Sequence, residues 1–236
     1  DQHSITRKVI FMRDKLNQNK HVLLLLYFPF YLAVFRYLEN TRPEHLHIIS
    51  SPLDQHIPFI PVFIIPYLFW FVYIAGPGLY FLFCEKEEFC RLMYFGMIGM
   101  TVFLLVSWIY PNGLDIRPDS FADNNIFTQL TRFVYSVDTS TNVLPSIHVY
   151  NSVGIYLAVR DSENLAGKKG IRYASLITTV LIILSTMFVK QHSVVDVFTG
   201  LMLSYVAYEL VYGGRAVQIW SSINMVKYRK KEELKS

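Results

Sequence analysis

The chain has 236 residues, of which 53% are hydrophobic and 16% aromatic, and it carries a formal net charge of +4. This apolar content is too high for an ordinary soluble domain of this length, so we expect an integral membrane protein. The small positive charge requires no nucleic-acid partner, because we expect the basic residues to lie in turns and tails beside anionic lipid headgroups.

Six apolar segments predict an all-α, polytopic membrane bundle with six transmembrane helices. A helix needs about 20 residues to cross a typical bilayer, and several segments are shorter, so some helix ends must extend into polar sequence or lie recessed. We expect a basic interfacial segment at 1–20, the membrane domain at 21–212 and a basic cytoplasmic tail at 213–236. The apolar segments span about 22–37, 57–83, 89–110, 146–159, 173–189 and 194–212.

The second apolar segment is rich in aromatic residues, including Tyr67 and Trp70, which we expect to face lipid. The longest polar stretch, 111–144, contains an amphipathic pattern typical of a helix at the membrane interface. Its apolar residues recur at the spacing i, i+4, i+7, i+8, and Asn124 or Asn125 could cap the helix start. These residues are Ile126, Leu130, Phe133 and Val134.

The basic residues predict the orientation of the bundle through the positive-inside rule. Most of them fall in the N-terminal segment, the turns near 86 and 165, and the C-terminal tail. We therefore expect both termini in the cytoplasm. The opposite, extracytoplasmic face keeps only Arg36, Arg42, Arg117, Arg132 and Lys190.

Two histidines at that extracytoplasmic face are the main functional candidates. His192 is followed four residues later by Asp196. Residues at this spacing share a face of a helix, so the carboxylate could orient the imidazole as a nucleophile or general base. His148 follows Pro145 and Ser146 and could protonate a leaving oxygen as a general acid. A buried, purely structural pair of His192 and Asp196 is the alternative interpretation.

Several groups near these histidines could bind an anion. Ser146 is a predicted N-cap, and the first-turn amides after it, starting at Ile147, form an anion-binding helix end. Arg117 offers a planar fork that matches phosphate oxygens, and Lys190 adds a point charge beside His192. Each cation could instead pair with a nearby aspartate or a lipid headgroup. Their convergence favours phosphoryl chemistry.

This set of residues resembles the type 2 phosphatidic acid phosphatase family, whose signatures read roughly Lys-x6-Arg-Pro, Pro-Ser-Gly-His and Ser-Arg-x5-His-x3-Asp. Arg117-Pro118 matches the end of the first signature, the segment 145–148 matches the second, and the segment 185–196 matches the third. Asp138 and Asn142 are similar to a branch that has Pro-Ser-x-His. The order and spacing agree over about residues 58–212.

The chain departs from these signatures at three positions. Tyr110 stands in place of the lysine, Ile147 in place of the glycine and Thr186 in place of the arginine of the third signature. Two cationic phosphate ligands of the family are therefore missing. We expect Lys190 to supply part of this charge, because the sequence Lys-Gln-His is similar to inositol phosphorylceramide synthases and related lipid phosphotransferases.

The resemblance implies that His192 attacks phosphorus and forms a phosphohistidine, with Asp196 stabilising the imidazolium and His148 protonating the leaving group. Arg117, Ser146, Lys190 and the amides that begin at Ile147 would hold the phosphate oxygens. No metal and no cofactor is implied. The first expectation is a lipid phosphate or pyrophosphate phosphatase, and the alternative is a lipid phosphotransferase. A non-catalytic lipid scramblase or carrier is a third possibility, and the oligomeric state is open.

Overall fold

The computed structural model describes residues 20–41, 45–121 and 123–214. The predicted interfacial segment 1–20 therefore lies outside the described residues except for Lys20, and the predicted tail 213–236 except for Gly213 and Gly214.

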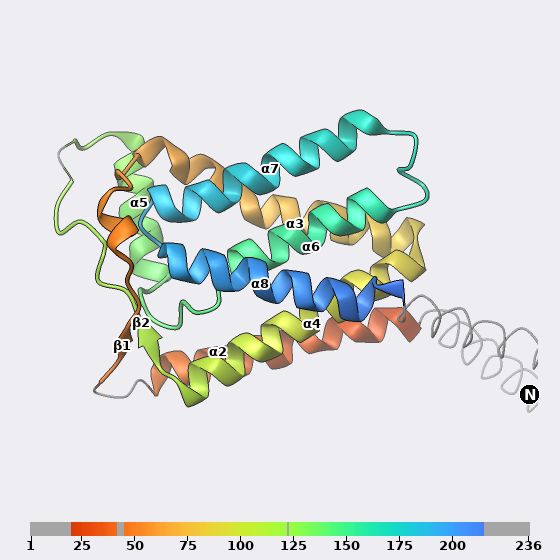
Figure 1. The fold of residues 1–236 in the computed structure, drawn as a ribbon, viewed down its shortest axis with the longest axis horizontal. Helices are drawn as coiled ribbons and strands as arrows, with labels where there is room; N and C mark the ends of the chain where they lie inside the picture. The colour runs from red at the N-terminus through yellow and green to blue at the C-terminus, as the bar shows by residue number, and fades with distance from the viewer. Residues whose placement is uncertain (1–19, 42–44, 122, 215–236) are drawn as a thin grey trace, which may run out of the picture.

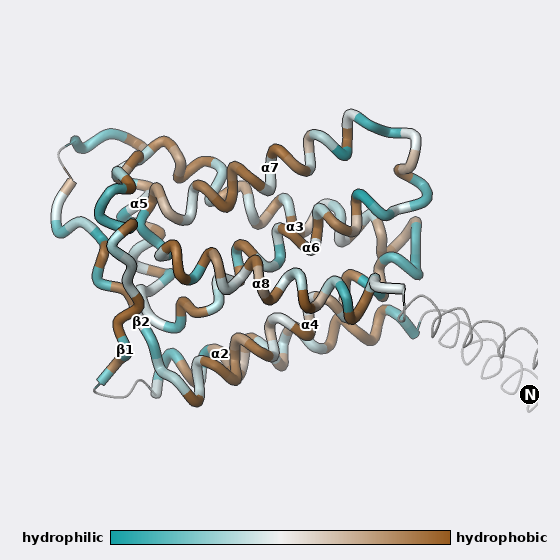
Figure 2. Tube along the Cα trace, viewed as in Figure 1, coloured by the Kyte–Doolittle hydropathy of each residue, from teal (hydrophilic) through white to brown (hydrophobic). Residues whose placement is uncertain are grey.

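The described residues form a helical bundle with seven α-helices and one short pair of strands. The helices run back and forth between two ends of the molecule (Figure 1). Their middle sections are hydrophobic and the hydrophilic residues gather at both ends (Figure 2). The helices are α2 (Tyr27–Asn40), α3 (Ile64–Cys84), α4 (Lys86–Ile109), α5 (Ile126–Val137), α6 (Ile147–Asp161), α7 (Lys169–Phe188) and α8 (Val194–Val211).

Five helical segments of the described chain are long and apolar enough to cross a membrane, in agreement with an integral membrane protein. Two of them begin with a 3-10 turn, at Lys20–Leu26 before α2 and at Pro61–Phe63 before α3. The five segments are Lys20–Asn40, Pro61–Cys84, Lys86–Ile109, Lys169–Phe188 and Val194–Val211.

The remaining predicted crossing, α6, is a short helix at the centre of the bundle. It has 15 residues, which corresponds to a length of about 22 Å, and it packs against α3, α4, α7 and α8. A hydrocarbon layer is about 30 Å thick. Because four helices surround α6, its chain can carry small and polar residues such as Ser152 and Gly154 without exposing them to lipid.

Glycines allow α6 to approach its neighbours closely. Tyr150 of α6 lies over Gly99 of α4, where an added Cβ would come within 2.1 Å of its ring. The Tyr150 hydroxyl donates a hydrogen bond to the carbonyl oxygen of Phe95 at 2.6 Å. On the α8 side, a Cβ at Gly200 would lie 2.9 Å from the carbonyl oxygen of Ser146. Gly200 thus lets the start of α6 rest directly on α8.

One end of the bundle carries the irregular connections that shape the candidate site (Figure 1). Strands β1 (His47–Ile48) and β2 (Asn112–Gly113) pair in parallel there. The 3-10 helix Pro52–Gln55 and α5 lie at the same end. The opposite end holds the α3–α4 and α6–α7 turns and the two ends of the described chain, Lys20 and Gly214.

The amphipathic helix predicted in the stretch 111–144 is present as α5, with the Asn125 side chain accepting hydrogen bonds from the amides of the first turn. The predicted apolar stripe is partly buried and partly exposed. Val134 is buried against Tyr67, whereas Ile126 and Phe133 are exposed. Leu130 packs against the same cluster as Val134, and the buried Thr128 and Thr131 donate their hydroxyl hydrogens to carbonyl oxygens of the chain at the start of the helix.

Candidate functional site

Three separate pieces of the chain meet at this end of the bundle. Arg117 lies in the loop that follows β2, and the segment Ser146–His148 forms the start of α6. The segment Lys190–Asp196 connects α7 to α8 and includes the first turn of α8. The residues predicted to act together therefore lie on the same end of the molecule (Figure 1).

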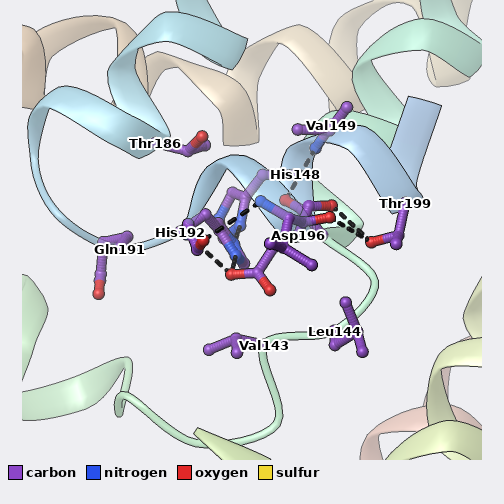
Figure 3. Close-up of polar contacts among 12 residues, drawn as sticks. Val143, Leu144, His148, Val149, Thr186, Gln191, His192, Asp196 and Thr199 are labelled. Carbon is purple, nitrogen blue, oxygen red and sulfur yellow. Dashed lines mark hydrogen bonds and ion pairs between the residues drawn. The ribbon is translucent and has the colours of Figure 1, made fainter. Parts of the chain in front are cut away.

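The two histidines are in direct contact. Nδ1 of His148 lies 3.3 Å from Nε2 of His192, and the ring centroids are 5.5 Å apart. His192 has only 7% of its surface exposed. Figure 3 shows both rings together beside Asp196. One of the two nitrogens must carry a hydrogen that the other accepts.

Asp196 contacts His192, although not in the way that the sequence suggested. Nδ1 of His192 is 3.4 Å from Oδ2 of Asp196. The helix α8 begins only at Val194, so the two residues do not share a helical face. Instead, Ser193 is the N-cap in a capping box, and its amide donates to the same Asp196 oxygen at 2.8 Å. The cap turns the carboxylate back toward His192, which precedes the helix.

These partners assign the hydrogens of the histidine pair. An ionised carboxylate can only accept hydrogen bonds, so the hydrogen on His192 belongs to Nδ1 and its Nε2 keeps a lone pair. The Nδ1 hydrogen of His148 then points at that lone pair. Asp196 is fully buried, and its second oxygen, Oδ1, has no hydrogen-bond partner in the described part of the chain. The carboxylate can therefore accept a further hydrogen bond.

The start of α6 has the predicted N-cap. The Ser146 hydroxyl oxygen accepts from the Val149 amide at 3.3 Å, and the Ser146 amide donates to the carbonyl oxygen of Asp196 at 3.1 Å. This second bond joins the first turns of α6 and α8. Ile147 and His148 are the first two residues of the helix, where backbone amides have no intrahelical acceptor.

Arg117 lies beside the segment that carries His192. Its guanidinium donates to the carbonyl oxygen of Asp138 at 2.7 Å and of Tyr135 at 3.3 Å, and to the side-chain oxygen of Gln191. It also stacks over the Tyr135 ring at 4.3 Å. Burial lowers the pKa of Arg117, and the nearby Tyr135 and Asp138 oppose that change. The Nε hydrogen has no protein acceptor among the described residues.

Lys190 is held away from the role predicted for it. Its ammonium donates to the carbonyl oxygen of Asp54 at 2.8 Å and to that of Ile57. Lys190 adopts a positive φ of 55° in the turn between α7 and α8. Burial lowers the pKa of Lys190, and Asp54 opposes that change. The ammonium binds the loop with these contacts, and no acceptor on the histidine pair is among them.

The two positions that lack the family's cations also have other partners. The Tyr110 ring stacks on His47, with centroids 4.1 Å apart. Thr186 is buried and its hydroxyl donates to the carbonyl oxygen of Ile183 at 2.8 Å. Its own carbonyl oxygen accepts from the amides of Gln191 and His192. Thr186 thus shapes the backbone turn before His192 and adds no charge.

Sequence reasoning missed two aromatic residues that hold His148. The rings of Tyr67 and Trp70 on α3 lie 4.8 and 4.5 Å from the His148 ring. The Tyr67 hydroxyl donates to the Asp138 carboxylate and accepts from the Gln191 amide at 3.3 Å. We expected Tyr67 and Trp70 to face lipid. The signal that could have found Tyr67 was its hydroxyl, because a buried tyrosine needs a polar partner.

Asp54 was the second omission. It is buried, with 4% of its surface exposed. Its carboxylate accepts from the Ser193 hydroxyl at 2.7 Å and from the Val194 amide at 2.9 Å. The sequence contained a weak signal, because Ser51-x-x-Asp54 and Ser193-x-x-Asp196 have the same capping-box spacing.

No protein-family model, curated protein or solved structure matches this chain. The roles of the site residues therefore depend on the geometry described above.

Proposed function

We propose that the protein is an integral membrane enzyme that breaks lipid phosphate esters through a phosphohistidine at His192. The observation that carries this proposal is the line of three groups Asp196, His192 and His148. A buried carboxylate faces one nitrogen of His192, and a second imidazole faces the other nitrogen at 3.3 Å. This is the arrangement of a nucleophile oriented by one group and paired with a proton donor.

In the proposed reaction the lone pair on Nε2 of His192 forms a bond to phosphorus, and the bond from phosphorus to the leaving oxygen breaks. His148, with a hydrogen on both ring nitrogens when the substrate is bound, gives its Nδ1 hydrogen to that oxygen and becomes a neutral imidazole. Asp196 stabilises the positive charge that develops on His192. Water or an alcohol then attacks phosphorus, the bond from phosphorus to nitrogen breaks, and His148 takes up the proton of the attacking group.

The phosphate oxygens need hydrogen-bond donors that are already in place, because such donors usually contribute most to the stabilisation of the transition state. The candidates are the first-turn amides of α6 that begin at Ile147, the Ser146 hydroxyl and the guanidinium of Arg117. In the resting structure the ring of His148 occupies the position in front of Nε2. We infer that a bound phosphate displaces this contact, so that the Nδ1 hydrogen of His148 no longer points at His192 and becomes available to the leaving oxygen.

The apolar character of the bundle supports a membrane lipid as the substrate. We propose that α6 is a sixth crossing, with both termini in the cytoplasm and the histidines at the extracytoplasmic face. The distribution of basic residues supports this orientation. Among the described residues, the end opposite the site carries Lys20, Lys86, Arg91, Arg160, Lys168, Lys169 and Arg172.

Hydrolysis of a lipid phosphate or pyrophosphate is the first candidate reaction. The charges around the site favour a second one, transfer of a phospho-headgroup to a lipid alcohol. Lys190 is engaged on the loop 52–57, and the carboxylate of Asp138 lies within reach of Tyr67 beside His148. A site with one guanidinium and nearby carboxylates suits a singly charged phosphodiester better than a doubly charged phosphate monoester.

The test is an assay of the purified protein with phosphatidic acid labelled in the phosphate, and with a labelled phosphodiester lipid plus diacylglycerol or ceramide as acceptor. Release of free phosphate supports hydrolysis, and a new phospholipid supports transfer. We expect His192→Ala to abolish both turnover and the covalent label on the protein, whereas His47→Ala, which changes a histidine stacked on Tyr110, keeps both. Turnover that persists in His192→Ala contradicts the proposal. If the parent protein turns over no lipid at all, the carrier interpretation replaces it.

A further inference from the structure

We propose that Asp54 is a positioning residue for His192, which it holds in place through the segment 190–194. This inference rests on the function proposed above. It assigns a role to a residue of the first extracytoplasmic connection, which contributes no group to the histidine line itself.

Asp54 contacts the chain both before and after His192. After His192, the Asp54 carboxylate accepts from the Ser193 hydroxyl at 2.7 Å and from the Val194 amide at 2.9 Å. Before it, the ammonium of Lys190 donates to the carbonyl oxygen of Asp54 at 2.8 Å. Asp54 therefore forms hydrogen bonds with the residue two positions before His192 and with the first and second residues after it.

The backbone of His192 itself bonds to the end of α7. Its amide donates to the carbonyl oxygen of Thr186 at 3.0 Å, as does the amide of Gln191 at 2.9 Å. These bonds tie the segment to the end of α7. The Asp54 contacts tie it to the loop 52–57, so the position of the imidazole relative to His148 is defined from two directions.

Asp54 is itself firmly held. It closes a capping box with Ser51, whose amide donates to the Asp54 carboxylate at 2.7 Å. The residue is 4% exposed, and its two oxygens accept three hydrogen bonds from Ser51, Ser193 and Val194. These three donors fix the position of the Asp54 carboxylate.

Asp54 and Asp196 act on the same short segment from opposite sides. Ser193 connects them, because its hydroxyl donates to Asp54 and its amide donates to Asp196. A shift of Ser193 after loss of Asp54 therefore also moves the carboxylate that orients His192. A displacement of about 1 Å of a reacting group can reduce a rate by about 100-fold, so the effect belongs to the chemical step.

The experiment compares Asp54→Asn with the parent protein in the full chain, with phosphatidic acid or the phosphodiester lipid as substrate, whichever the parent turns over. Asparagine keeps the size of the side chain but has a single acceptor oxygen, so it can accept from Ser193 or from Val194 and not from both, because these two groups donate to different Asp54 oxygens. We expect kcat to fall about 10- to 100-fold with KM changed less than about threefold. The rate of covalent labelling of His192 in a single turnover should fall by the same factor.

Two further variants separate positioning from loss of folding. Ser51→Ala removes the cap of the 3-10 helix at Leu53 but leaves the Ser193 and Val194 contacts, so it should keep kcat within about threefold. Lys190→Met removes the bond on the other side of His192. Because both changes release the same segment, the double variant Asp54→Asn/Lys190→Met should be far less impaired than the product of the single effects.

The inference is overturned if Asp54→Asn keeps the parent kcat, if it raises KM alone, or if its effect multiplies with that of Lys190→Met. These results leave the proposed function intact as long as His192→Ala is inactive. Turnover by His192→Ala removes the proposed function and this inference together, so the two failures are distinguishable.

Discussion

Arg117 combines three hydrogen bonds and one ring contact that a lysine cannot reproduce. The guanidinium bridges Asp138 and Gln191 while it stacks on Tyr135, which requires its planar fork. We expect Arg117→Lys to reduce kcat/KM about 30- to 100-fold, equivalent to about 2–3 kcal/mol of transition-state stabilisation. The matched control is Arg132→Lys on the exposed side of α5, which should stay within twofold. Steady-state kinetics of both variants test this prediction. Equal losses in Arg117→Lys and Arg132→Lys would assign the effect to α5 as a whole, because Arg132 belongs to α5 and Arg117 contacts Tyr135 of the same helix.

Asp196 orients His192 through a single oxygen. The same oxygen faces the Ser193 amide and Nδ1 of His192. An Asn that turns its NH2 group to this position loses both bonds and favours the wrong tautomer of His192, and an Asn that keeps its oxygen there has no negative charge to stabilise the imidazolium. We expect Asp196→Asn to reduce kcat by about 100- to 10,000-fold, the range seen when the orienting carboxylate of a catalytic histidine is lost. Asp161→Asn, which removes the partner of Arg160 at the other end of the bundle, is the control. An Asp196→Asn variant with normal kcat would leave His192 and Asp196 only a structural role.

Residue types and spacing predicted the location of His148, His192 and Asp196, because imidazole and carboxylate groups are rare in apolar sequence. They did not predict the direction of a long side chain. The ammonium of Lys190 donates to the carbonyl oxygen of Asp54 in the loop 52–57, a contact between segments far apart in the chain, and no local pattern indicates either this contact or the positive φ of the lysine. Asp54 stayed hidden because its partners lie more than 130 residues away in the chain.

At the level of helices, the contact between α6 and α8 depends on Gly200. An added Cβ would lie 2.9 Å from the carbonyl oxygen of Ser146 and 3.2 Å from Cβ of Val149. The backbone of α6 must therefore shift, which costs about 1–3 kcal/mol for overpacking. We expect Gly200→Ala to lower the thermal unfolding midpoint and to reduce kcat more than tenfold, because Ser146 and His148 move together with the start of α6.

The control for this prediction is Gly96→Ala on α4, where an added Cβ meets no atom within 4 Å. This variant should match or slightly exceed the parent in stability, since alanine is the better helix former. Thermal unfolding in detergent and steady-state kinetics measure both effects. If Gly200→Ala and Gly96→Ala behave alike, the close approach of α6 and α8 is not what sets the site.

Hydropathy located the helices well and their ends poorly. The central helix α6 begins at Ile147 and ends at Asp161, close to the predicted segment, because its apolar run is bounded by the Ser146 cap and by charged residues. The long segment predicted at 57–83 instead starts as a 3-10 turn at Pro61, since the proline-rich sequence before it cannot continue a helix. The helical period located α5 and its cap at Asn125, whereas the contact of Val134 with Tyr67 of α3 comes from tertiary packing, which a period alone does not contain.

On the scale of the whole molecule, the basic residues divide between the two ends of the bundle. The end that holds the turns of α3–α4 and α6–α7 carries Lys20, Arg160 and Lys168 among others, while the site end carries Arg36, Arg117, Arg132 and Lys190. Arg117 and Lys190 are engaged by protein groups. Within the described part of the chain, basic residues are thus more numerous opposite the site, which predicts that the site faces away from the cytoplasm.

A cysteine-labelling experiment in intact cells tests this orientation. Cys84 is exposed at the end opposite the site, and Asp123, just before α5, is exposed at the site end. In a Cys90→Ser background, we expect a membrane-impermeant maleimide to label Asp123→Cys/Cys84→Ser before the cells are opened, and to label Cys84 only after they are permeabilised. The variant without any cysteine gives the background. The reverse labelling pattern would place His192 at the cytoplasmic face, because Asp123 and the histidines lie at the same end of the bundle.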